Sequence, residues 1–370
     1  MLPTGVGKTW VGITVACKQI INGRIESVLV VTPTTVLIEQ WKNQVIKFYG
    51  EDMLQFFNFS CIQSAHKNAS YADLLIIDEI HTSLSPIYSK VFENVLYKQI
   101  LGLTATIPEK GVATKILDKY CPVIFTYSVN DAAENQIVAD CQMYNLEVTL
   151  SKSDRAKYKL FDGNYNRALL TIGMLKRYFP HLKDSSIFDI AREYAKLDTK
   201  SQESEEAQNL VKASKAYWSA MTLRKWVCYE AQSKIEAVLD LIKKFPLKKW
   251  ILFNKSIKFA ELLHERIPGS GLYHSNMKSN DRAKIIRKFA DGEIHILVCV
   301  DALNAGLDIP DADAAICISG VSTELVAVQQ RGRITRKDGH KIAKFINLYC
   351  KDTVEKGWVE KKTKAFNGVV

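Results

Sequence analysis

Zinc-binding and disulfide patterns are missing from this 370-residue chain. Its eight cysteines form no C-x-x-C pair and several lie in apolar runs, which is typical of reduced core residues and excludes a zinc site. No apolar run approaches the length of a membrane span, and the N-terminus carries no signal pattern. We therefore expect no membrane partner, no secretion, and a location in the cytoplasm or, for a viral protein, in the host cytoplasm.

The chain has fewer acidic residues than basic ones, and this imbalance is relevant to whether its binding partner is negatively charged. The formal net charge is +10, and residues 234–370 hold 24 Lys and Arg against 16 Asp and Glu. A basic half suggests a polyanionic partner such as nucleic acid, although a basic surface that only keeps the protein soluble explains the charge equally well. With 47% hydrophobic and 24% charged residues, the chain is globular and long enough for two cores.

A glycine-rich loop opens the chain, where residues 2–9 read LPTGVGKT. The glycines let backbone N–H groups point at phosphates, Lys8 supplies a charge, and the Thr9 hydroxyl is placed for Mg²⁺. A chance glycine turn is the alternative, but a helical stretch and an apolar run follow, as such a loop requires. We expect ATP and Mg²⁺ as ligands. The predicted nucleotide-binding residues here are Thr4, Gly5, Gly7, Lys8 and Thr9.

A hydrophobic strand normally leads into a loop of this kind, and here only Met1 precedes Leu2. We therefore expect either that the native gene product carries upstream residues or that the first sheet lacks this front strand. The segment that would recognise the base is missing with it, so the sequence leaves base selectivity open.

Short apolar runs alternate with helical stretches in two sets, which indicates parallel α/β sheets. The runs are residues 27–31, 74–77, 100–103, 250–253, 295–300 and 314–318. We predict an α/β fold of two tandem parallel-sheet domains with a helical insert between them. The expected boundaries are 1–130 for the first, ATP-binding domain, 131–233 for a linker and helical insert, and 234–370 for the second domain.

Two carboxylates, Asp78 and Glu79, follow the apolar run 74–77. Four consecutive apolar residues predict a strand buried on both faces, and ligands bind at the carboxyl ends of such strands. Adjacent buried carboxylates are costly unless a cation compensates them, as Mg²⁺ bound to a triphosphate does. We predict that Asp78 holds the metal through a water molecule, that Thr9 also contributes to the metal site, and that Glu79 activates the attacking water. The alternative is an acidic surface turn.

Residues 78–81, which read DEIH, resemble the DExH box of the superfamily 2 helicases. Other segments resemble further motifs of that family in the same order along the chain. They are 31–34 with Leu37, Gln40 and Trp41, then 103–106, 250–256, 273–275, 297–310 and 329–336. The resemblance leaves out only about residues 150–232, and it implies that both sheet domains are RecA-like motor domains.

The resemblance also implies roles for single residues. Arg333 and Arg336, one helical turn apart, would act as catalytic residues by reaching the γ-phosphate from the second domain. The further nucleotide contacts would be Asp308 and Gln329. The residues that couple hydrolysis to movement would be His81, Thr104 and Thr106. The nucleic-acid contacts would be Thr32, Pro33, Thr34, Asn254, His274 and Ser275.

These side chains also have plainer interpretations. Threonine and serine at strand ends often cap helices or turns. His81 also suits an ordinary helix N-terminus, and His274 suits a buried, hydrogen-bonded histidine.

Aromatic and basic residues interleave near the end of the insert, between residues 217 and 229. They suit stacking on bases. The helical spacing of Trp218, Met221, Lys225 and Tyr229 equally predicts one packed face, and we favour that interpretation.

The whole layout resembles the phage and cellular DNA repair and recombination helicases, including branch-migrating enzymes, more than the DEAD-box RNA helicases. We expect an ATP-dependent helicase or translocase on branched or duplex DNA, bound through the backbone with weak sequence preference. The alternatives are an RNA helicase of the same superfamily and a truncated nucleic-acid-binding remnant without ATP turnover. The sequence leaves the oligomeric state open.

Overall fold

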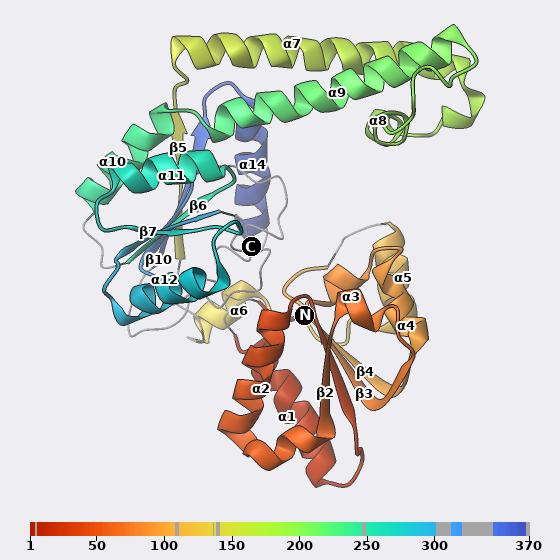
Figure 1. The fold of residues 1–370 in the computed structure, drawn as a ribbon, viewed down its shortest axis with the longest axis vertical. Helices are drawn as coiled ribbons and strands as arrows, with labels where there is room; N and C mark the ends of the chain where they lie inside the picture. Colours follow the sequence, from red (N-terminus) through yellow and green to blue (C-terminus); the bar gives the residue numbers. More distant parts are fainter. Residues whose placement is uncertain are drawn as a thin grey trace.

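Two α/β domains and a helical insert make up the computed structural model (Figure 1). It describes residues 1–3, 6–107, 111–135, 137, 141–245, 249–300, 312–319 and 343–367. Both sheets are parallel, which confirms the predicted fold class. In Figure 1 the insert extends from the second domain on the side away from the first. No helix within these ranges is long and apolar enough to cross a bilayer.

The first domain is built on a four-stranded sheet in the order β2-β1-β3-β4. Its strands are β1 (Val28–Thr32), β2 (Phe57–Cys61), β3 (Ser70–Asp78) and β4 (Val95–Leu103). Its α-helices are α1 (Lys8–Ile21), α2 (Thr35–Tyr49), α3 (Ile62–Ala65), α4 (Val91–Asn94) and α5 (Val112–Tyr120), with α6 (Val129–Glu134) after them. Short 3₁₀ helices are η1 (Glu51–Phe56), η2 (Ile80–Ser83) and η3 (Tyr88–Lys90).

The central strands β1 and β3 are the apolar runs of the sequence. Every residue of β1 is buried, as are the last seven of β3, because helices cover both faces of a parallel sheet. Among the described residues 1–3 and 6–7 no strand precedes α1. The Leu2 N–H there donates to the Thr104 carbonyl at 2.9 Å, just beyond the end of β4.

The second domain has a six-stranded sheet in the order β5-β10-β9-β6-β8-β7. Its strands are β5 (Cys141–Val148), β6 (Trp250–Asn254), β7 (Gly271–Tyr273), β8 (Ile296–Val300), β9 (Ala314–Cys317) and β10 (Ala343–Cys350). Its helices are α10 (Ser233–Lys244), α11 (Ile257–Arg266), α12 (Ser279–Asp291) and α14 (Val354–Asn367). The strand β5 lies within residues 131–233, which we predicted to be a linker and helical insert, and it pairs with β10 of the second sheet.

The insert is a long helical hairpin with a short helix packed on it. Its elements are α7 (Lys152–Leu175), η4 (Lys176–Tyr178), η5 (Pro180–Leu182), α8 (Ile187–Tyr194) and α9 (Glu205–Tyr229). Ser151 and Ser204 cap the N-termini of α7 and α9 by accepting backbone N–H bonds. A separate core that includes Ile172, Ile190 and Leu210 holds the three α-helices together.

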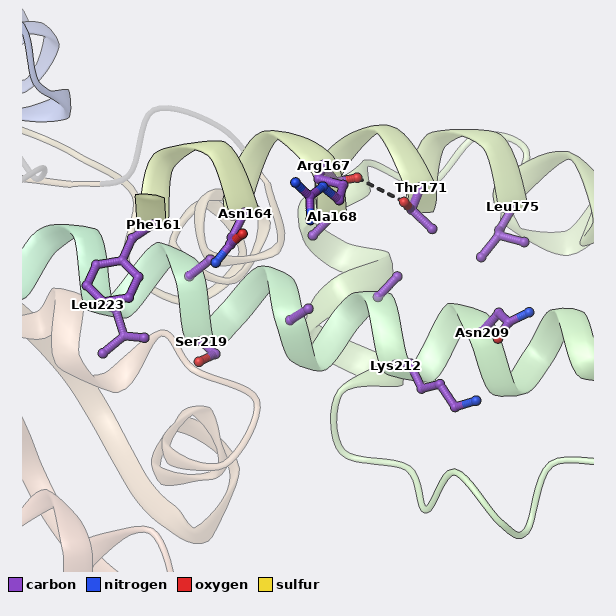
Figure 2. Close-up of a pocket in the computed structure, with 13 residues that line it drawn as sticks. Phe161, Asn164, Arg167, Ala168, Thr171, Leu175, Asn209, Lys212, Ser219 and Leu223 are labelled. Carbon is purple, nitrogen blue, oxygen red and sulfur yellow. Dashed lines mark hydrogen bonds between the residues drawn. The ribbon is translucent and has the colours of Figure 1, made fainter. Parts of the chain in front are cut away.

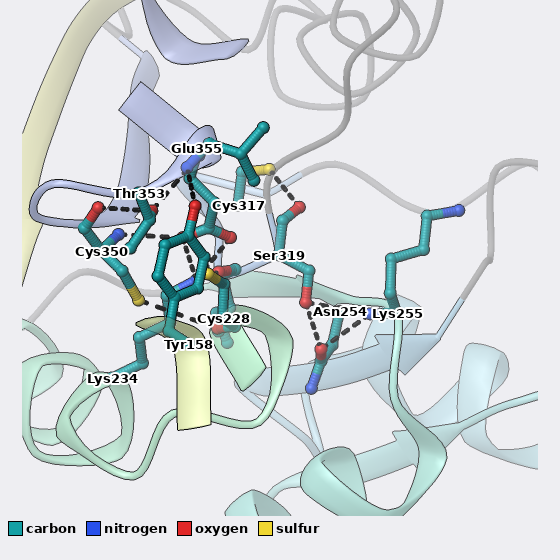
Figure 3. Close-up of polar contacts among 12 residues, drawn as sticks. Tyr158, Cys228, Lys234, Asn254, Lys255, Cys317, Ser319, Cys350, Thr353 and Glu355 are labelled. Carbon is teal, nitrogen blue, oxygen red and sulfur yellow. Dashed lines mark hydrogen bonds and ion pairs between the residues drawn. The ribbon is translucent and has the colours of Figure 1, made fainter. Parts of the chain in front are cut away.

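A buried ion pair ties the last helix to the second sheet (Figure 3). The Lys234 ammonium lies 2.8 Å from the Glu355 carboxylate, and both side chains are fully buried. Lys234 also donates to the Ile318 carbonyl at 2.7 Å, and the Cys350 N–H donates to Glu355 at 2.8 Å. The pair therefore joins α10, α14 and the ends of β9 and β10. Cys228 lies beside this cluster, but the ammonium already compensates the carboxylate.

Replacing Lys234 by Ala should leave the Glu355 carboxylate buried without its cation. We expect the free energy of unfolding to fall by roughly 3–5 kcal/mol in urea titrations. The control is Arg266→Ala, which breaks an ion pair of similar length, 3.0 Å, on the surface. That change should cost less than about 1 kcal/mol. Equal decreases in the free energy of unfolding of Lys234→Ala and Arg266→Ala would show that the buried ion pair matters no more for stability than the surface pair.

Candidate functional site

The carboxyl ends of the central strands of the first sheet and the N-terminus of α1 lie together. Lys8 is the first residue of α1 and is 9% exposed. Gly7 before it has a φ of 86°, a left-handed conformation that favours glycine. The N-terminus of a helix presents free N–H groups and the positive end of the helix dipole, so this end of α1 suits an anion.

Asp78 and Glu79 follow directly at the end of β3. Asp78 is 5% exposed, and each of its oxygens accepts a hydrogen bond. The donors are the Glu79 N–H to Oδ1 at 3.0 Å and the Trp41 indole N–H to Oδ2 at 2.9 Å. Burial, and then the charge of Glu79, raises the pKa of Asp78 to about 6. These two N–H groups orient the Asp78 carboxylate, but both are neutral and do not compensate its negative charge.

Glu79 is held in a strained backbone conformation beside Lys8. Its φ of 49° lies in the left-handed region, which few residues other than glycine adopt, and such strain is common at functional sites. Its Oε1 atom is 3.4 Å from the Lys8 ammonium. Two neighbouring carboxylates thus share one lysine. Oxygen ligands with excess negative charge are what Mg²⁺ prefers, so this donor set fits a magnesium ion.

His81 links the carboxylates to the segment after β4. Its Nδ1 atom is 2.9 Å from the Thr104 hydroxyl and 3.4 Å from Glu79 Oε2. Burial lowers the pKa of His81, so the ring is neutral at pH 7 and its contact with Glu79 is not an ion pair. Thr104 also donates to the Thr106 carbonyl at 2.7 Å. The structure therefore brings together all three residues predicted to couple hydrolysis to movement, while their role stays a prediction.

The predicted nucleic-acid residues at the first sheet lie at the end of β1 and the start of α2. Thr32 is 1% exposed, and its hydroxyl donates to the Thr34 carbonyl at 2.9 Å. The Thr32 side chain therefore shapes the turn, while Pro33 and Thr34 are half-buried. Pro33 and Thr34 are therefore more accessible at this turn than Thr32, and the predicted nucleic-acid contacts stay predictions.

The predicted nucleic-acid residues of the second domain lie at one edge of its sheet. Asn254, at the end of β6, accepts bonds from the Lys255 N–H at 2.7 Å and the Ser319 hydroxyl at 2.6 Å (Figure 3). The Asn254 side chain therefore connects the segment that follows β6 to Ser319, which follows β9. His274 is 8% exposed, and its Nδ1 has no hydrogen-bond partner among the described residues. Ser275 is exposed and remains available to a ligand.

Two family models match this chain at the positions of its two sheet domains. The model of the type III restriction enzyme res subunit matches residues 1–109, and that of the helicase conserved C-terminal domain matches residues 233–338. The DNA 3'-5' translocase XPB2 of Sulfurisphaera tokodaii is 28% identical over 370 residues, covering 96% of this chain and 78% of that protein. The chain belongs to superfamily 2 of the helicases.

Two further comparisons concern parts of this helicase or its fold. The ATP-dependent RNA helicase DHH1 of Candida glabrata is 30% identical over 111 residues, which are 29% of this chain and 22% of that protein. The crystal structure of the Pyrococcus furiosus Hef helicase domain superposes with a TM-score of 0.54, covering 98% of this chain and 94% of that one. At 14% identity this likeness concerns the fold alone, and it supports two tandem RecA-like domains.

Several predicted site residues of the helicase lie outside the described residues. They are Thr4, Gly5, Asp308, Gln329, Arg333 and Arg336. Their roles stay predictions.

The aromatic residues of the insert are mostly packed. Tyr217 is 4% exposed, and Trp218 lies against Phe188 with ring centroids 5.3 Å apart. The Arg224 guanidinium lies 3.5 Å from the Tyr165 ring centroid. These contacts confirm the packed-face interpretation for this part of α9. The alternative, in which Tyr217 stacks on a base, is wrong because its side chain is buried.

A pocket lies along the two long helices of the hairpin (Figure 2). A groove of about 570 Å³ runs between α7 and α9, lined by small residues such as Ala168 and Ala213 and by the basic Arg167 and Lys212. Nothing in the sequence pattern indicated this groove.

Trp41 is the site residue whose main contact the sequence does not reveal. The motif resemblance placed it with a nucleic-acid segment, yet its ring is fully buried and donates to Asp78. A glycine in α1 makes room for this ring, because a Cβ at Gly12 would lie 2.6 Å from Trp41 Cη2. The combination of Gly12 and a tryptophan in the next helix was the available signal.

Replacing Asp78 by Asn should stabilise the helicase without nucleotide and metal at pH 7.5, by about 1–3 kcal/mol. The folded pKa of about 6 lies above the ordinary value of about 3.9, so the charged carboxylate costs stability above pH 6 and nothing below pH 4. The gain should therefore shrink as the pH falls between these values. Urea titrations at several pH values measure it.

The matched control is Asp118→Asn, at an exposed aspartate of the same domain. It should change the free energy of unfolding by less than about 0.5 kcal/mol at every pH. A loss of stability in Asp78→Asn at pH 7.5 would show that the carboxylate is compensated in the free protein.

Proposed function

We propose that this superfamily 2 helicase is an ATP-driven DNA helicase or translocase that acts on branched or duplex DNA in repair, recombination or replication. The observation that carries the ATP part is the pair Asp78 and Glu79 beside Lys8, at the carboxyl edge of a parallel sheet. For DNA, the support is that the XPB2 translocase aligns with 96% of the chain, whereas DHH1 aligns with 29%.

The residues of the first domain would divide the work on ATP. Lys8 would bind phosphate oxygens and leave Glu79, which it contacts at 3.4 Å in the free protein. Thr9 and Asp78 would hold Mg²⁺, which supplies charge neutralisation at the phosphates when bound. Glu79 would accept a proton from the attacking water, and its Oε2 atom has no hydrogen-bond partner among the described residues that would compete for this role.

The second domain would complete the site with charge. Arg333 and Arg336 would stabilise the γ-phosphate, since a guanidinium stays charged and pairs with phosphate oxygens. Asp308 and Gln329 would add contacts to the nucleotide. The nucleotide would then favour a closed arrangement of the two domains, and hydrolysis would release it. If both domains contact the same nucleic-acid strand, one cycle of ATP binding and hydrolysis would shift the contact of one domain along the strand relative to the contact of the other.

An RNA helicase is the second candidate, because the 111-residue match to DHH1 is 30% identical. One assay separates the candidates: ATP hydrolysis by the purified chain with single-stranded, duplex and forked DNA and with matched RNA. We expect stimulation by DNA of about tenfold or more over RNA. Stimulation by RNA alone would favour the RNA helicase. No hydrolysis with any of them would indicate a binding remnant.

Variants in the same assay test the roles of single residues. Glu79→Gln should lower the turnover about 10²–10⁴-fold and leave nucleotide affinity near the wild-type value, since only proton acceptance is lost. Lys8→Ala should weaken nucleotide binding itself, measured with a fluorescent ADP. Hydrolysis by Glu79→Gln at the wild-type rate would rule out its role as the base.

A further inference from the structure

Trp41 lies where four parts of the first domain meet. Its indole ring is fully buried in the core with Leu103, the last residue of β4. A Cβ at Gly12 of α1 would lie 2.6 Å from the ring and 2.9 Å from Leu103 Cδ1, so α1 packs closely on both. The indole N–H reaches Asp78 Oδ2 at 2.9 Å. One rigid ring thus packs on the helix that begins at Lys8, shares a core with the end of β4 and donates a hydrogen bond to Asp78.

The hydrogen bond restricts the carboxylate. Asp78 is 5% exposed, and its described donors are the Trp41 N–H and the Glu79 N–H, one to each oxygen. Each carboxylate oxygen can accept more than one bond, so these donors fix the plane of the group and leave lone pairs for a ligand. Groups that orient a metal ligand in this way commonly change metal affinity 10–100-fold when they are removed.

Trp41 also belongs to the element that begins at the predicted nucleic-acid contacts. The helix α2 starts at Thr35, directly after Thr34, and Trp41 lies about 9 Å further along it at 1.5 Å per residue. A packed helix moves as a unit, so a shift at its N-terminus moves the indole relative to Asp78. The described residues offer no other side chain of α2 with a hydrogen bond to Asp78 or Glu79.

We propose that Trp41 is a positioning residue: its indole N–H holds Asp78 in the orientation that binds the metal, and it transmits the state of the nucleic-acid contacts at the start of α2 to that carboxylate. The second half rests on the proposed function. The Trp41 side chain is fully buried, so we assign it no direct contact with ATP or nucleic acid. It acts through Asp78 by setting where one carboxylate points.

The test compares Trp41→Phe with a matched control in the same helix. Trp41→Phe keeps an aromatic ring in the core and removes the N–H donor. Val45→Ala, one turn further along α2, removes packing from the same core, where Val45 is also fully buried and has no polar atom. Three quantities are measured for each: the affinity for Mn²⁺ with ADP by electron paramagnetic resonance, nucleotide-free DNA affinity, and the ratio of ATP turnover with and without DNA.

For Trp41→Phe we expect Mn²⁺ affinity 10–100-fold weaker, a stimulation ratio close to one, and unchanged DNA affinity. Val45→Ala should melt at a lower temperature yet keep Mn²⁺ affinity and the stimulation ratio within about twofold. Wild-type Mn²⁺ affinity in Trp41→Phe would overturn the proposal. So would equal Mn²⁺ losses in Val45→Ala, because the effect would then be one of general destabilisation.

A second variant covers the case in which Trp41→Phe does not fold. Gly12→Ala places a methyl group against the indole ring and should displace it from Asp78, with the same loss of Mn²⁺ affinity. Wild-type Mn²⁺ affinity in a folded Gly12→Ala variant would count against the proposal. If DNA does not stimulate the wild-type chain, the proposed function fails, while the Mn²⁺ comparison still decides whether Trp41 positions Asp78.

Discussion

Two adjacent carboxylates at the buried end of one strand impose the main electrostatic constraint on the first domain. Burial and the charge of Glu79 raise the pKa of Asp78 to about 6, and Lys8 is shared at 3.4 Å from Glu79. A stable domain can tolerate two neighbouring carboxylates with one lysine, but their negative charge is balanced only when a further cation binds. In our account that charge comes with the nucleotide, so the free protein keeps a site that favours its ligand.

The rest of the domain follows from placing these groups together. Parallel strands bring the ends of β1, β3 and β4 to one edge, and α1 points its positive end at the same place. The Trp41 ring packs closely on Gly12 and so joins the two helices, α2 and α1, that flank this edge. The second domain repeats the parallel architecture, and its own buried charges, Lys234 and Glu355, are paired at 2.8 Å. Lys234 and Glu355 compensate each other, whereas the two carboxylates of Asp78 and Glu79 have one lysine, Lys8, beside Glu79.

Much of this was predictable from the sequence, because strands buried on both faces leave continuous apolar runs. Residues 74–77 and 250–253 lie within β3 and β6. Two of the strands outside the predicted runs lack that signal: β5 carries exposed residues such as Tyr144, and β7 has only three residues. The proximity of Lys8 to Glu79 was predictable, because the two motifs place these residues at the start of a helix and at the end of a central strand, while the roles of Lys8, Asp78 and Glu79 stay predictions. The bond from Trp41 to Asp78 was not, since it joins residues 37 positions apart through tertiary packing.

The uncompensated carboxylates are tested most directly by thermal unfolding of the wild-type chain with ADP alone, with Mg²⁺ alone and with both. If Asp78 and Glu79 bind a metal that the nucleotide carries, ADP and Mg²⁺ together should raise the melting temperature by several degrees. This increase should be well beyond the sum of the increases with ADP alone and with Mg²⁺ alone. A melting temperature that stays unchanged with both ligands at millimolar concentration would contradict the account.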